Sequence, residues 1–226
     1  YILMSFVFKR FASTGAKSAK KYMAPKPVNG PTHAKLSAAQ KAYLDRVIRV
    51  DQAGELGADL IYAGQYAALG HRKDLKKLIR HMWDQEIHHH ATFDALQNGL
   101  RARPSLLTPL WKVGAFGLGL FGGMMGKEVS MACTEAIETV IGSHYNTQLR
   151  VLSNNFSDIK DLKTGKCTHS EEVKNIQNHI KTFRDQEGEH LHIAVTHDAD
   201  KARPHWLIYN TVKLITKSAV YTAERV

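Results

Sequence analysis

Apolar residues recur at steps of three and four along most of the chain after about residue 44. This spacing is typical of amphipathic helices that turn one face toward a core. Glycine and other turn-forming residues separate the segments, and the alternation typical of strands is rare. The pattern predicts an all-α fold, with helical segments at residues 44–69, 75–96, 131–152 and 173–194 and a further helix within 205–221.

Ionisable residues lie on the same four apolar stripes. The first and third stripes each carry one glutamate, and the second and fourth each carry a Glu-x-x-His pair inside the repeated string Asp-Gln-Glu-x-x-His. A charged carboxylate that faces a core without a partner costs several kcal/mol, so a cation has to compensate it. Glutamate plus Glu-x-x-His from each of two helix pairs is the ligand set of a two-metal site in a ferritin-like four-helix bundle. The six predicted metal ligands are Glu55, Glu86, His89, Glu138, Glu187 and His190.

The distances along the chain test this prediction independently. The turn near Gly70 lies about as far after Glu55 as before the pair at 86 and 89, so an antiparallel hairpin brings these residues to one level. In the second half, the midpoint between the lone glutamate and the pair falls near residue 163, in a segment with the composition of a loop. The matched spacing in the two hairpins predicts one metal site that both hairpins share. Its oxygen-rich, thiolate-free ligands favour iron or manganese over structural zinc.

Neighbouring ionisable residues offer alternative ligands. Three histidines are consecutive at 88–90, and successive helical residues point about 100° apart, so they cannot all face one site. Of these, His89 shares the stripe of Glu86, whereas Glu189 and His192 form an i, i+3 pair on a polar face of the fourth helix. Three aspartates are candidates either to hydrogen-bond the ligand histidines or to lie on a solvated helix face: Asp51, Asp84 and Asp185.

The segment between the two predicted hairpins is apolar and rich in glycine. Its core, residues 113–126, has no charged residue and contains six glycines in 14 positions, with Lys112 and Lys127 at its flanks. It is too short to span a bilayer, which needs about 20 apolar residues, and glycine disfavours a helix in water. These features favour a membrane-surface element within residues 100–126 over a buried crossover helix packed on the bundle.

Positive charge is concentrated near the N-terminus. The chain has 31 Lys or Arg and 21 Asp or Glu, yet residues 1–44 hold eight of the basic residues and no acidic one. The remainder, 23 basic against 21 acidic residues, gives little support to nucleic-acid binding. Residues 1–37 have the composition of a mitochondrial transit peptide, with a disordered basic tail as the alternative. Residues 38–226 are predicted to form the metal-binding domain, and Cys133 and Cys167 predict neither a disulfide framework nor a zinc site.

Several longer strings stand in order along residues 38–226: Asp51-Gln-Ala-Gly-Glu-Leu-Gly-Ala58, Ile61-Tyr-Ala-Gly-Gln65, Met82-Trp-Asp-Gln-Glu86, Arg103-Pro-Ser-Leu-Leu-Thr-Pro-Leu-Trp111, Ala132-Cys-Thr-Glu135, His144-Tyr-Asn146 and His197-Asp198. Together they resemble the demethoxyubiquinone hydroxylases of ubiquinone biosynthesis. By this resemblance the six residues found above bind two iron ions, and His144 and Tyr145 take part in electron delivery. From the sequence alone, Tyr145 can equally be a core residue. The chain departs from the family's more acidic fourth-helix string at Gly188 and His192.

The resemblance implies a specific reaction. An O2-dependent di-iron monooxygenase would hydroxylate demethoxyubiquinone, a polyprenylated quinone that lacks one ring oxygen, with NADH as the proposed reductant. It would lie peripherally on the matrix face of the mitochondrial inner membrane. A lipid-binding partner protein within a multiprotein synthesis complex would present the substrate. Two alternatives stay open: a ferritin-like protein that oxidises or handles iron, and a non-catalytic scaffold that binds quinone or lipid.

Overall fold

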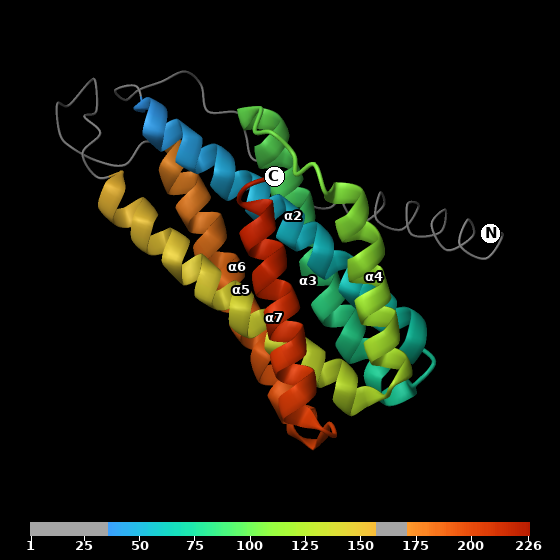
Figure 1. Ribbon diagram of the computed structural model, residues 1–226. Helices are drawn as coiled ribbons and strands as arrows, with labels where there is room; N and C mark the ends of the chain where they lie inside the picture. The colour runs from blue at the N-terminus through green and yellow to red at the C-terminus, as the bar shows by residue number, and fades with distance from the viewer. Residues whose placement is uncertain (1–35, 157–170) are drawn as a thin grey trace.

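The computed structural model describes residues 36–156 and 171–226, and the described chain is almost entirely helical (Figure 1). The elements in these ranges are α2 (Ala38–Leu69), α3 (Lys73–Leu100), α4 (Thr108–Met124), α5 (Lys127–Asn155), α6 (Glu171–Thr196), the 3-10 helix η1 (Ala199–Lys201) and α7 (His205–Ala223). The all-α class and the five helical segments expected from the periodicity are confirmed. The basic segment up to residue 35 and the loop expected near residue 163 lie outside the described residues.

The first hairpin forms where the sequence provides a cap and a turn. Ser37 Oγ accepts a hydrogen bond from Gln40 N at 3.2 Å, and Ser37 N donates to Gln40 Oε1 at 2.9 Å. This capping box satisfies two backbone donors at the start of α2. Gly70 ends α2, and α3 begins at Lys73. The short connection makes α2 and α3 antiparallel, as the spacing around Gly70 predicts.

Helices α2, α3, α5 and α6 form a bundle with a polar middle and two apolar ends. One buried apolar cluster includes Ile48 and Phe93, and a second includes Met82 and Met131. On α2, α5 and α6, the ionisable residues of the stripe lie between the positions that join these two clusters, and on α3 they lie at the boundary between them. The apolar clusters therefore close the polar middle of the bundle at both ends.

The crossover helix α4 packs along α2 with close backbone contact. A Cβ at Gly64 would lie 2.5 Å from Leu120 N and Phe116 O, and one at Gly119 would overlap the carbonyl of Ile61. Only glycine fits where two helix backbones approach this closely. The expectation that the glycines of residues 113–126 disfavour a packed crossover helix was wrong, because α4 packs on α2 and Gly119 permits the closest contact. Contact of this segment with a membrane stays a prediction.

The last helix, α7, packs on α5 and α2 and lies across the bundle, in red in Figure 1. Arg49 of α2 holds its C-terminal end. The buried guanidinium donates to Ala223 O at 3.2 Å and to Glu224 O at 3.0 Å. A cation at this position satisfies free carbonyls and suits the helix dipole. Across residues 36–156 and 171–226, none of the helices combines the length and the apolar character needed to cross a membrane.

Candidate metal centre

The six predicted ligands meet in the middle of the bundle. The lone glutamates come from α2 and α5, and the Glu-x-x-His pairs come from α3 and α6. All six side chains are buried, with exposed fractions between 0% and 3%. Their ligand atoms form two overlapping groups, and the atoms of each group lie within 4.8 Å of one another: Glu55, Glu86, His89 and Glu187 in the first, and Glu86, Glu138, Glu187 and His190 in the second.

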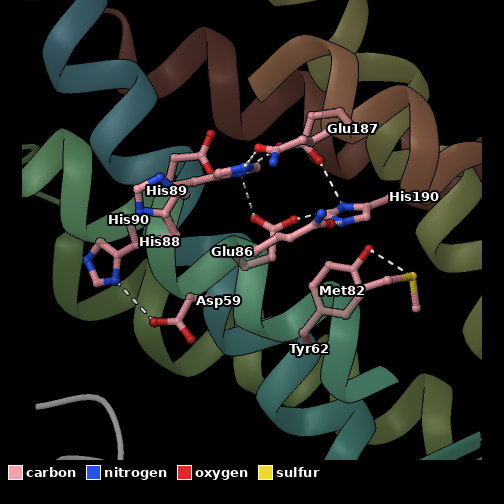
Figure 2. A network of polar contacts seen from close by, with 12 residues as sticks. Asp59, Tyr62, Met82, Glu86, His88, His89, His90, Glu187 and His190 are labelled. Carbon is pink, nitrogen blue, oxygen red and sulfur yellow. Dashed lines mark hydrogen bonds and ion pairs between the residues drawn. The ribbon is translucent and has the colours of Figure 1, made fainter. Parts of the chain in front are cut away.

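Two of the glutamates, Glu86 and Glu187, belong to both groups. His89 Nδ1 lies 3.2 Å from Glu187 Oε1, and His190 Nδ1 lies 3.0 Å from Glu86 Oε1. Figure 2 shows these four side chains pointing toward one another from α3 and α6. The arrangement suits two metal ions, each with one histidine, one lone glutamate and both shared carboxylates.

The buried charges of this cluster shift one another's pKa values. Burial raises the pKa of Glu55 to about 8, although the charge of His89 opposes the shift. Burial and the charges of two neighbouring glutamates raise the pKa of Glu138 well above its ordinary value. Burial alone would lower the pKa of His89 and His190, but the surrounding carboxylates raise both well above the usual range. Positive charge is favoured throughout this space.

The buried polar atoms of the centre test whether a metal fits. Among the described residues, Glu55 Oε2, both carboxylate oxygens of Glu86 and His89 Nδ1 are buried and make ion-pair contacts of 3.0–3.7 Å within the cluster, but no well-directed hydrogen bond. Buried polar atoms are nearly always paired, so a cluster of such atoms calls for an ion. The four carboxylates carry four negative charges, which two divalent cations would balance. The donor set therefore fits two divalent ions of the iron or manganese type.

Two tyrosines bind the lone glutamates from the opposite helix. Tyr62 of α2 donates to Glu138 Oε1 of α5 at 2.7 Å, and Tyr145 of α5 donates to Glu55 Oε1 of α2. Burial and the nearby carboxylates raise the pKa of both hydroxyls well above the ordinary value, so both stay donors. Each tyrosine follows the lone glutamate of its own helix by seven residues, a signal that the sequence analysis did not use. The electron-delivery role of Tyr145 stays a prediction.

The second predicted electron-delivery residue, His144, lies nearer the surface in a polar network. Gln148 Nε2 donates to Asp51 Oδ1 at 2.7 Å and lies 2.8 Å from His144 Nε2. The rings of His144 and Tyr145 have centroids 6.5 Å apart. The prediction that Asp51 hydrogen-bonds a ligand histidine was wrong, because its hydrogen-bond partner in this network is Gln148.

For the other two aspartates, the alternative of a solvated helix face is confirmed. Asp84 forms an ion pair with Arg80 at 2.5 Å, and Asp185 forms one with Arg184 at 2.6 Å. Their side chains are 45% and 60% exposed. An aspartate two positions before a core-facing glutamate points about 200° away from it around the helix, so it faces the solvent.

Two glutamines make the contacts with the ligand histidines for which the aspartates were candidates. His89 Nε2 lies 2.7 Å from Gln186 Oε1, and His190 Nε2 lies 2.6 Å from Gln85 Oε1. Neither glutamine was predicted as part of the site from the sequence. The signal was present, because glutamine precedes the glutamate in each copy of the repeated string.

The rival histidines and glutamate lie outside the centre. His90 Nδ1 lies 3.0 Å from Asp59 Oδ2 of α2, turned away from the cluster (Figure 2). The ring of His88 packs edge-on against Phe183. Glu189 pairs at 3.6 Å with a histidine of α3 at the exposed surface. Of the three consecutive histidines, only His89 joins the cluster.

An apolar cavity of about 410 Å³ borders the helices of the centre, between α2, α4, α5 and α7. Gly54 and Ile137 line it, and they directly precede the predicted ligands Glu55 and Glu138. Every lining residue except Thr216 is apolar. The cavity therefore lies against the turns of α2 and α5 that present the two lone glutamates.

Glycines keep this cavity open. A Cβ on Gly54, Gly57 or Gly114, which all line it, would meet no atom within 4 Å. These three glycines differ from Gly64 and Gly119, where a Cβ would meet the backbone of the facing helix. The sequence analysis did not predict the cavity, and it did not separate the two kinds of glycine.

Comparison with known proteins finds relatives that match most of the chain. The sequence matches the family described as Ubiquinone biosynthesis protein COQ7 over residues 42–223. It is 54% identical over 202 residues to "5-demethoxyubiquinone hydroxylase, mitochondrial" of Saccharomyces cerevisiae, covering 89% of this chain and 86% of the relative. It is 40% identical over 185 residues to the Homo sapiens "NADPH-dependent 3-demethoxyubiquinone 3-hydroxylase, mitochondrial", covering 82% of this chain and 79% of the relative. The "3-demethoxyubiquinol 3-hydroxylase" of Rhodospirillum rubrum matches with the same identity and coverage.

Proposed function

This chain belongs to the family of the ubiquinone biosynthesis protein COQ7, and we propose that it is a demethoxyubiquinone hydroxylase of ubiquinone biosynthesis. The buried cluster of four carboxylates and two imidazoles carries the proposal. The names of the yeast and human relatives, which match more than four-fifths of the chain, support the same reaction. The substrate is a polyprenylated benzoquinone or quinol that lacks one ring oxygen.

The proposed cofactor is a pair of iron ions. Glu86 and Glu187 would contact both ions, Glu55 and His89 would complete the first set, and the remaining pair from α5 and α6 would complete the second. When bound, iron supplies the activation of O2 and the transfer of one oxygen atom to the quinone ring. The residues of the chain hold the ligands in place, and the two apolar clusters at the ends of the bundle exclude water.

The apolar cavity is the proposed binding site of the quinone. Leu110 of α4 and Ile215 of α7 line it and are 58% and 49% exposed, so it opens to the surface between these helices. Apolar cavities of a few hundred Å³ suit small hydrophobic ligands. A quinone that enters here meets the turns of α2 and α5 that carry Glu55 and Glu138.

The surface around this opening supports attachment to a membrane. Large apolar side chains are exposed on α4, on α7 and just before α4, on the same elements as the exposed basic residues Lys112 and Lys217, which suit anionic lipid head groups: Leu106, Leu110, Val113, Leu214 and Tyr221. The relatives are named as mitochondrial proteins. We place the protein peripherally on the matrix face of the inner membrane. There a lipid-binding partner within a ubiquinone-synthesis complex would present the substrate.

The proposed electron path uses His144 and Tyr145, with NADH as the electron donor. His144 is the outer residue, with 16% of its side chain exposed, and Tyr145 donates a hydrogen bond to Glu55. The human relative is named as dependent on NADPH. The two nicotinamides therefore have to be compared directly.

Metal content measured together with turnover tests the proposal. Purified protein loaded anaerobically with Fe(II) should bind two irons per chain. With O2 and NADH or NADPH it should then add one oxygen atom to demethoxyubiquinone. Iron oxidation without quinone product would favour the iron-handling alternative. Quinone binding without metal or turnover would favour the scaffold. Either result would overturn the hydroxylase assignment.

A further inference from the structure

The two copies of the Asp-Gln-Glu-x-x-His string contact each other through their glutamines. Gln85 of α3 places its amide oxygen 2.6 Å from His190 Nε2 of α6. Gln186 of α6 places its amide oxygen 2.7 Å from His89 Nε2 of α3. The glutamine of each copy therefore holds the histidine of the other copy.

This contact determines which ring nitrogen keeps its proton when the ring is neutral, as a metal ligand must be. An amide oxygen only accepts hydrogen bonds, so Nε2 of each histidine is the donor. A neutral ring then has its lone pair on Nδ1, the nitrogen that faces the carboxylates in both cases. Since a metal binds the unprotonated nitrogen, the glutamines select the tautomer that can bind a metal, and they also fix the orientation of the rings.

We infer that Gln85 and Gln186 are positioning residues that hold His190 and His89 crosswise in their metal-binding tautomers. This inference rests on the proposed metal centre and adds two residues that do not touch the ions. Because the paired residues come from different helices, each histidine is correctly held only while α3 packs against α6. Metal affinity is thereby coupled to the association of the two hairpins.

The choice of an amide follows from the charge of the centre. Four carboxylates already balance two divalent cations, so an aspartate or glutamate against either histidine would add uncompensated negative charge in a buried space. A glutamine oxygen accepts the same hydrogen bond without that charge. The aspartates of the repeat, Asp84 and Asp185, pair instead with arginines at the surface.

Substitutions that remove only the acceptor test the inference. Gln85→Leu and Gln186→Leu keep the approximate size of the side chain. Each should lower the affinity for Fe(II) or Co(II), titrated anaerobically into the full chain, by about 10- to 100-fold. Asp84→Asn and Asp185→Asn are matched controls in the same strings, and they should leave the affinity within about twofold of the wild type.

A second measurement reads the crosswise arrangement without any metal. In protein with ¹⁵N-labelled histidines, Gln85→Leu should shift the Nε2 signal of His190, and Gln186→Leu should shift that of His89. Unchanged ring signals together with unchanged metal affinity would overturn the inference. So would a shift confined to the histidine of the same string.

Conservative variants separate this role from a simple folding defect. Gln85→Glu and Gln186→Glu retain an acceptor but add a buried negative charge. They should keep the Nε2–H signal of the facing histidine, which the leucine variants lose, even where the added charge lowers stability. If the glutamate and leucine variants lose this signal and the metal alike, the tautomer argument is wrong. If wild-type protein binds no Fe(II) or Co(II), the proposed metal centre fails instead, and the ring signals still report whether the glutamines hold the histidines.

Discussion

The metal centre and the apolar cavity border the same turns of α2 and α5, yet they are built in opposite ways. The centre fills its space with six ionisable side chains that come from all four helices of the bundle. The cavity exists because side chains are missing at Gly54, Gly57 and Gly114. A site that needs charge is encoded by residues that stand out in the sequence. A site that needs room is encoded by small residues whose purpose shows only when the helices are assembled.

Each region can therefore be disrupted by a substitution that leaves the other intact. Glu55 and Gly54 are neighbours on α2, but one faces the centre and the other lines the cavity. Loss of a ligand should empty the centre without filling the cavity, and an added side chain in the cavity should leave the metal in place. The predictions below use this independence.

The largest effect is expected from loss of a ligand. Glu138→Gln should lower the metal content and reduce O2-dependent turnover by more than about 100-fold. Loss of a residue that only supports the ligands costs up to about 100-fold, so a ligand should cost more. The metal-free variant should be at least as heat-stable as the metal-free wild type. It removes a carboxyl whose ionised form burial and the neighbouring glutamates disfavour, and its amide oxygen still accepts from Tyr62.

Metal analysis, turnover and thermal unfolding measure these outcomes. Quinone binding should persist in this variant, and quenching of the fluorescence of Trp111, which lines the cavity, can report it. Retained turnover in the metal-depleted variant would mean that the cluster has no part in the reaction.

The next effect is expected from filling the cavity. Gly57→Leu adds a side chain to the cavity at a position where a Cβ meets no other atom. It should weaken quinone binding and raise the KM for quinone by about tenfold or more. A tenfold change corresponds to a loss of about 1.4 kcal/mol of binding free energy. Iron content should not change. Stability should hold or rise by up to about 1 kcal/mol, because glycine is a poor helix former.

Gly188→Leu is the matched control for this variant. Gly188 also lies within a helix, a Cβ there meets no atom, and it does not line the cavity. The control should gain similar stability with an unchanged KM. An equal rise of KM in both variants would show that the effect does not come from the cavity.

The sequence predicted the convergence of the six candidate ligands for a physical reason. Helical periodicity fixes which residues share a face, and the repeated string supplied two sets of ligands at matched distances from a turn. The same periodicity could have excluded Asp84 and Asp185, which point away from the centre. The crosswise pairing of Gln85 and Gln186 could not be predicted, because it depends on how α3 and α6 pack against each other.

The crossover was harder to interpret for a different reason. Its glycines weaken an isolated helix, and that property alone suggested that the segment is not packed as an ordinary helix. In the fold, Gly119 lies against the backbone of α2 beside Gly64, a contact that joins residues far apart in the sequence. Whether a glycine serves close packing or open space depends on what faces it.

A smaller effect distinguishes these two kinds of glycine by stability. Gly119→Ala should destabilise the protein by about 1–3 kcal/mol, because its Cβ would overlap the Ile61 carbonyl and push α4 from α2. Gly117→Ala, two positions earlier with open space at its Cβ, should be neutral or stabilising. Denaturant unfolding of the two variants measures the difference. Equal stabilities would mean that α4 does not depend on this contact.

The smallest effect concerns a buried carboxylate outside both regions. Asp51 lies one turn before Glu55 on α2. It accepts from Gln148 and faces His144 of α5. Burial raises its pKa, although the hydrogen bond and charge of His144 oppose the shift. A substitution at Asp51 therefore tests whether a buried carboxylate recruits a metal when the other ligands are absent.

Asp51→Asn should leave the metal content unchanged and alter the pH dependence of stability. Because the folded-state pKa of Asp51 lies above its unfolded value, the carboxyl is fully compatible with the fold below about pH 4, and stability is lost as the pH rises and the group ionises. An asparagine oxygen can still accept from Gln148 and never ionises. The variant should therefore be more stable than the wild type at pH 7.5, by less than the loss expected at Gly119, and should match it at pH 4.

Denaturant unfolding of the metal-free proteins at both pH values measures this difference. A variant that is less stable than the wild type at pH 7.5 would show that His144 more than compensates the buried charge. Buried charge would then be tolerated outside the centre without a metal.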